Sequence, residues 1–127
     1  MKPILTSQAP RPAGHYSQGI EHAGLVFVAG QLAIDPDTGS IVGEDDADAQ
    51  TVRALRNVQA ILEAGGSGLH RLLSVTIYIT GHELWGPVNQ AFARVMGDHR
   101  PARAIVPVPG LRPGCLVEIQ AVAARAE

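Results

Sequence analysis

The chain has 127 residues, a mass of 13.3 kDa and a formal charge of −2, which fits one domain (residues 1–127) and leaves no room for two independent cores. Apolar residues make up 46% of the chain, too many for a disordered protein, and a pI near 6.2 argues against a nucleic-acid partner bound on a strongly basic surface. Lys2 is the single lysine among ten basic residues, which disfavours a Schiff-base lysine within the fold.

Cysteine usage and hydropathy indicate the compartment. The single cysteine, Cys115, cannot form a disulfide within the chain. The N-terminal segment lacks the apolar run of a signal peptide, and the longest apolar stretch, residues 25–30, is far shorter than the roughly 20 residues of a membrane span. We therefore expect a soluble, cytoplasmic protein with no membrane partner.

The N-terminal part is expected to contain an irregular segment, a strand and a turn. Pro3, Pro10 and Pro12 favour extended or irregular backbone over the first fifteen residues. The run from Leu25 to Gly30 predicts a strand that continues to Ile34. Residues 35–39, Asp-Pro-Asp-Thr-Gly, are typical of a turn because proline presets one φ and glycine accepts a positive φ. Two strands flanking this turn would form a hairpin.

A helix should follow. The acidic residues between Glu44 and Asp48 suit a helix N-terminus, whose unpaired N–H groups attract negative charge, and Gly65-Gly66 suits its end. Apolar side chains then recur at helical spacing on one face, at Val52, Leu55, Val58 and Leu62.

The C-terminal part alternates strands with a second helix. Residues 74–80 alternate cleanly, with Val75, Ile77 and Ile79 on one side, which predicts a strand. Thr80 to Glu83 has the spacing of a capping box, and Pro87 would lie in an early turn of a helix ending near Gly97. That helix would bury a stripe formed by Leu84, Val88, Phe92 and Val95 or Met96. Residues 104–108 and 116–123 predict two closing strands.

This order predicts the α+β class, with a single mixed β-sheet and two helices on one face. A chain of this length has no segment left to cover the second face. Apolar residues on both sides of several strands favour burial of that face against another copy, so we expect a symmetric homo-oligomer.

Few residues are arranged for known chemistry. The five histidines lack metal-ligand spacing, so no metal site is expected. Cys115 lacks a visible base, and we interpret it as a small residue at a loop or strand edge.

Tyr16 either lines a pocket or covers an edge of the core. Arg103 is either solvated or held in a cleft, where its fork of donors suits a carboxylate. Glu118 lies in an apolar strand and either faces solvent or needs a partner or a wet cavity.

Short motifs along nearly the whole chain resemble the RidA/YjgF family of imine deaminases, once labelled L-PSP ribonucleases. Their order and spacing, rather than any single motif, carry the resemblance. The motifs are Ala9-Pro10, Gly14-His15-Tyr16-Ser17-Gln18, Val28-Ala29-Gly30-Gln31, Gln50-Thr51 with Asn57, Ile61-Leu62, Val88-Asn89, Pro101-Ala102-Arg103, and Val117-Glu118-Ile119 with Ala121.

The resemblance implies a chorismate-mutase-like fold assembled as a homotrimer, with active sites between subunits. It implies hydrolysis of 2-imino acids and their enamines, such as 2-aminoacrylate, 2-iminopropanoate and 2-iminobutanoate, to 2-oxo acids and ammonia without a cofactor. Arg103 would clamp the substrate carboxylate, Glu118 would hold or activate water, and Tyr16 would line the pocket. The remaining substrate-binding positions would be Gly30, Asn89 and the backbone of Ile105.

Other functions stay open on the sequence. One is a pathway-specific relative, such as an aminomuconate-type deaminase or a member of pyrimidine breakdown. Another is a non-catalytic trimer that binds small carboxylates. RNA cleavage is the weakest alternative, because the net charge is −2 and no histidine pair or lysine is placed for it. The chain departs from the family pattern at His15, Ala29, Trp85 and Ala104, and we expect His15 and Ala104 to lie near the pocket.

Overall fold

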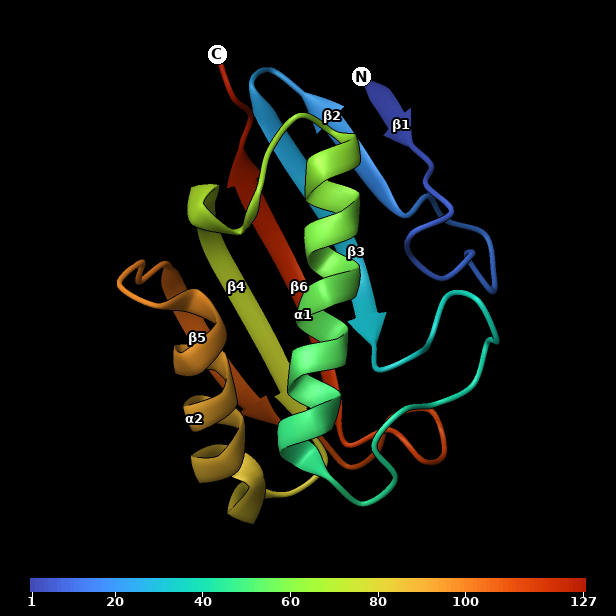
Figure 1. Cartoon of the computed structure of the whole chain (residues 1–127), viewed down its shortest axis with the longest axis vertical. Coiled ribbons are helices and arrows are strands. Elements are labelled where there is room, and N and C mark those ends of the chain that lie inside the picture. The colour runs from blue at the N-terminus through green and yellow to red at the C-terminus, as the bar shows by residue number, and fades with distance from the viewer.

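One six-stranded sheet carries two helices on the same face (Figure 1). The computed structural model describes all of residues 1–127. This architecture confirms the α+β class and the placement of both helices on one side. The strands are β1 (Lys2–Ile4), β2 (Gly19–His22), β3 (Leu25–Leu32), β4 (Leu72–Ile79), β5 (Ala102–Pro107) and β6 (Val117–Ala124). The helices are α1 (Ala47–Ala64) and α2 (Trp85–Met96), with short 3-10 turns η1 (Leu69–Arg71) and η2 (His82–Leu84).

The strand order, β1-β2-β3-β6-β4-β5, puts the C-terminal strand β6 near the middle and β5 at an edge. All neighbouring strands are antiparallel except β4 and β5. A parallel pair needs a long crossover, and α2 supplies it. The strands expected at residues 74–80, 104–108 and 116–123 are confirmed within about two residues. The sequence does not predict β2, and it predicts only extended or irregular backbone for the segment that contains β1. Both strands are too short to show a clear alternation of apolar and polar residues.

The turn at residues 35–39 is confirmed, whereas the hairpin around it is reduced to one bridge. Gly39 has a φ of +74°, and its N–H donates to the carbonyl of Asp35. Beyond the turn only Ile34 and Ile41 pair. Strand β3 ends at Leu32, two residues before the predicted end.

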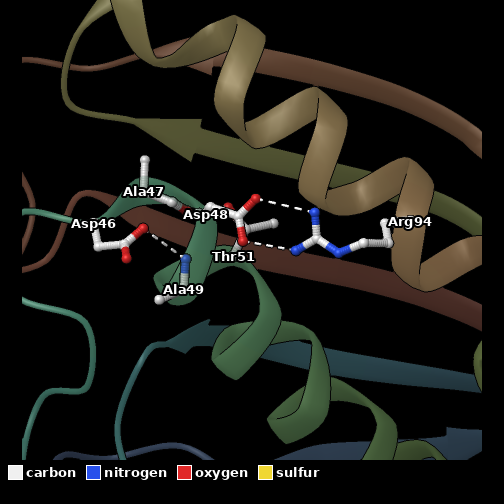
Figure 2. Close-up of polar contacts among 6 residues, drawn as sticks. All are labelled: Asp46, Ala47, Asp48, Ala49, Thr51 and Arg94. Carbon is white, nitrogen blue, oxygen red and sulfur yellow. Dashed lines mark hydrogen bonds and ion pairs between the residues drawn. The ribbon is translucent and has the colours of Figure 1, made fainter.

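Helix α1 begins and ends where expected. The Asp46 side chain accepts a hydrogen bond of 3.0 Å from the Ala49 N–H, and Gly65 is the C-cap. In the first turn, Asp48 accepts two hydrogen bonds, of 2.7 and 3.1 Å, from Arg94 of α2 (Figure 2). The buried face includes Leu55, Val58, Ile61 and Leu62, whereas Val52 is only half-buried.

The capping box predicted at the start of the second helix is wrong. Thr80 and Gly81 precede the turn η2, and α2 begins at Trp85 without any side-chain cap. Pro87, the third residue of α2, has no N–H, so one fewer donor needs a cap. The predicted stripe is confirmed at Val88, Phe92 and Met96, and Gly97 ends the helix with a φ of +64°. Neither helix is both long and apolar enough to cross a bilayer.

The two faces of the sheet differ in what covers them. Val75, Ile77 and Ile79 of β4 are buried beneath the helices, in a core of 21 residues. Neither helix covers the opposite face (Figure 1). That face, which we name the open face, carries Phe27 with 42% of its surface exposed and Val106 with 36%. Apolar side chains therefore do lie on both sides of the sheet.

Candidate functional site

The predicted site residues fall into two groups that one chain does not bring together. One group lies on α2 and β5 and contains Asn89, Arg103 and Ile105. The other lies on β3, β6 and the loop before β2 and contains Tyr16, Gly30 and Glu118.

Arg103 and Glu118 point to opposite faces of the sheet. Paired residues on neighbouring strands share a face, and Arg103 pairs with Val75, which is buried beneath the helices. Glu118 pairs with Tyr78 and lies between the buried residues Val117 and Ile119. Because successive residues of a strand alternate, Glu118 extends to the open face.

Arg103 lies against two aromatic rings beside a pocket of about 420 Å³. Its guanidinium carbon is 5.1 Å from the ring centre of Phe92 and 5.9 Å from that of Trp85, distances at which a cation is attracted to a ring face. We name this space the Arg103 pocket; its lining includes Asn89, Phe92, Met96, His99, Arg100 and Arg103.

The Arg103 guanidinium forms no hydrogen bond or ion pair within the chain, whereas Arg94 on α2 is paired with Asp48. Burial lowers the pKa of Arg103 from its ordinary value, although an arginine remains charged at neutral pH. A partly buried, unpaired guanidinium is suited to a carboxylate, and such a charge-assisted bond contributes about 1.5–3 kcal/mol.

Two neighbours complete the Arg103 side of the site. Asn89 is half-buried and lines the same pocket. The Ile105 side chain packs against the core, opposite Ile77 of β4. Ile105 can therefore reach a ligand only through its backbone, on a strand whose outer edge pairs with no other strand.

Tyr16 lies on a second pocket, of about 440 Å³, at the C-terminal end of β3. We name it the Tyr16 pocket; its lining includes Arg11, Tyr16, Gly30, Asp35, Asp37 and Arg112. The hydroxyl of Tyr16 accepts a hydrogen bond of 3.2 Å from the Ala13 N–H, and 52% of the residue is exposed. The phenol therefore keeps its own proton free to donate to a ligand.

The Glu118 carboxyl group lies directly against the backbone of Gly30. A Cβ atom at Gly30 would come within 3.0 Å of Glu118 Cδ, a contact tighter than real Cβ atoms normally make. The irregular pairing between Val28 and Gln31 places Gly30 there. Glu118 is half-buried and has no hydrogen-bond partner within the chain, so its carboxylate is available to water or substrate.

One supporting residue had no recognisable role in the sequence. Gln18 is 1% exposed and hydrogen-bonds the backbone of Thr6, Ala9 and Pro10, which holds the loop that carries Arg11. Only its place beside Tyr16 in a motif could have indicated it.

The structure offers neither an activated thiol nor a group of metal ligands. Cys115 is buried just before β6, and burial raises the pKa of its thiol, which keeps the sulfur protonated. No three histidine, cysteine or acidic side chains are grouped as metal ligands.

Known proteins resemble the whole chain. The family model for endoribonuclease L-PSP matches residues 6–125. A RutC family protein of Pyrococcus horikoshii is 42% identical over 120 residues, or 94% of each chain. The 2-iminobutanoate/2-iminopropanoate deaminase of Salmonella typhimurium is 33% identical over 127 residues, or 98% of each chain. The crystal structure of Escherichia coli TdcF with bound serine has a TM-score of 0.93 at 32% identity, covering 99% of this chain and 100% of that one.

Proposed function

The chain belongs to the endoribonuclease L-PSP family, also known as the RidA/YjgF family, and we propose that it hydrolyses reactive 2-imino acids and their enamines. The products are the 2-oxo acid and ammonia. The substrate class includes 2-aminoacrylate, 2-iminopropanoate and 2-iminobutanoate. A relative that bears the name of this activity matches 98% of the chain at 33% identity, which supports the proposal.

The observation that carries the proposal is the unpaired guanidinium of Arg103. It lies beside a pocket, against Phe92 and Trp85, with no acidic side chain of the chain bound to it. Its planar fork of donors can hold a 2-imino carboxylate in two parallel hydrogen bonds, which fixes the orientation of the neighbouring C=N bond. Asn89 and the backbone of Ile105 then lie beside the bound substrate.

The reaction needs one group that moves a proton. The imine carbon is already electrophilic, so a water molecule adds to C2 as the C=N π electrons move to nitrogen. Glu118 carries two protons, one after the other, from the oxygen to the nitrogen. The first comes from the attacking water and gives the neutral carbinolamine; the second comes from the carbinol hydroxyl, so that the nitrogen leaves as ammonia when the C=O bond forms. The Tyr16 hydroxyl and the Gly30 backbone line the water side of the site.

This assignment requires a second copy of the chain. Arg103 and Glu118 lie on opposite faces, so one subunit cannot offer both to one small substrate. We place the site between the Arg103 pocket of one subunit and Glu118 of its neighbour, in a homotrimer. Exposed apolar residues on the open face, such as Phe27 and Val106, are suited to the same contact.

The test is the rate of 2-oxo acid formation from 2-aminoacrylate generated in situ, above the spontaneous rate. Arg103→Ala should lower kcat/KM by about 100-fold or more, because both the bond and the orientation are lost. Arg56→Ala, on the exposed side of α1, is the matched control and should keep the wild-type rate. A wild-type rate in Arg103→Ala would refute this role of Arg103. Binding of small carboxylates without turnover of any imine would show a binding protein instead of an enzyme.

A further inference from the structure

Every ionisable side chain that lines the Arg103 pocket is basic. Arg100, Arg103 and His99 contribute to it, and no aspartate or glutamate does. Asp98, the acidic residue next to His99, does not line it. The pocket therefore has capacity for more negative charge than the single carboxylate that Arg103 would bind.

Arg100 is free to take a ligand. It forms no hydrogen bond or ion pair within the chain, unlike Arg94, which is bound to Asp48. Arg100 lies in the loop before β5, three residues before Arg103, so their Cα atoms are at most about 10 Å apart, and both residues line the pocket. Two long side chains rooted at that spacing can converge on the two ends of one small molecule.

His99 lines the same pocket and is held in place by a hydrogen bond. Its Nε2 lies 2.8 Å from the carbonyl oxygen of Leu72, and only a protonated Nε2 can donate to that acceptor. The ring is therefore anchored to the start of β4, with Nδ1 left free for a polar group.

We propose that Arg100 binds a second acidic group on the substrate, so that the preferred substrates are 2-imino dicarboxylic acids. The inference rests on the imine hydrolysis proposed above and names the substrate class of that site. Arg103 holds the carboxylate next to the imine carbon, and Arg100 holds the carboxylate at the far end of the side chain. Phe92 and Met96 contact the methylene groups between them.

The experiment compares two imines of the same length that differ in one charge. The imines of glutamate and glutamine are generated in situ by an amino acid oxidase, and kcat/KM is measured for each. The ratio of the two values is the readout, so a general change in activity cancels. The wild-type ratio should favour the glutamate imine by about fivefold and should decline as salt rises.

Arg100→Gln should bring this ratio close to one, whereas the control Arg56→Gln should leave it at the wild-type value. A wild-type ratio near one, or a ratio that Arg100→Gln does not change, would overturn the inference while leaving the imine hydrolysis intact. Absence of turnover of both imines while 2-aminoacrylate is still hydrolysed would also overturn the inference, whereas absence of turnover of all three would refute the proposed function.

Discussion

The Arg103 pocket and the Tyr16 pocket are nearly equal in volume, about 420 and 440 Å³, but they differ in charge and in what surrounds them. The ionisable side chains of the Arg103 pocket are all basic, with no aspartate or glutamate among them. The second combines Arg11 and Arg112 with Asp35 and Asp37. Strands β6 and β4 separate β3, which holds Gly30, from β5, which holds Arg103.

The separation of the two pockets bears on how the proposed reaction would be divided between subunits. A guanidinium and a carboxylate in direct contact would neutralise each other, and neither would remain free for a substrate. Keeping Arg103 and Glu118 on opposite faces leaves both unpaired in the subunit. In the site that we propose, assembly would bring the substrate anchor and the proton acceptor to one place.

The largest effect is expected from mixing two inactive variants. Arg103→Ala and Glu118→Gln should each lose most activity alone. In trimers reassembled from equal amounts, about a quarter of the sites would receive Arg103 from one subunit and Glu118 from its neighbour. We expect activity to return to about that fraction, measured as 2-oxo acid release after mixing, denaturation and refolding. No recovery, with trimers formed, would mean that both residues act in one subunit.

The next largest effect is expected from a substitution that disturbs the contact between Gly30 and Glu118. In Gly30→Ala the added methyl group would meet Glu118 Cδ at 3.0 Å and displace the carboxylate. We expect kcat to decline by about tenfold, which equals about 1.4 kcal/mol in the barrier. Gly110→Ala is the control, because no atom lies within 4 Å of its Cβ position. An equal loss in both variants would contradict the proposed role of the contact.

Gln18→Ala should loosen the Tyr16 pocket alone. It removes the buried hydrogen bonds to Thr6, Ala9 and Pro10, and we expect unfolding to require about 2–3 kcal/mol less. Urea unfolding measures the loss, and amide hydrogen exchange locates it. Exchange should accelerate at residues 6–16 and stay unchanged at residues 99–107. Acceleration in both segments would show that the two pockets are coupled within the subunit.

The smallest effect concerns the ion pair between the helices (Figure 2). Neither Asp48 nor Arg94 lines the Arg103 pocket or the Tyr16 pocket. The hydrogen bond from Arg94 lowers the pKa of Asp48. A lowered pKa gives stability that is complete above the unfolded value, near 3.9, and is lost as the pH declines through the folded value. Asp48→Asn should therefore lower Tm slightly at neutral pH, and this difference should disappear in acid. In a protein that already carries Arg94→Gln, adding Asp48→Asn should cause no such difference in Tm at any pH.

The sequence indicated the fold well where periodicity is strong. Val75, Ile77 and Ile79 identified β4, and Asp46 and Gly65 lie where the acidic run and the glycine pair placed the ends of α1. It failed at the start of α2, where a capping-box spacing is no guarantee of a cap. The short strand β2 carries too few residues for alternation to be distinguished from chance.

For the site, the sequence by itself determined which residue types are present and that its motifs resemble those of imine deaminases. It also placed Glu118 among apolar residues of a predicted strand. Only the tertiary structure decided that Arg103 and Glu118 face opposite sides, that Phe92 and Trp85 flank Arg103, and that Gly30 leaves room for Glu118. The physical reason is that side-chain alternation is local, whereas a shared face depends on the register of strands distant in the chain.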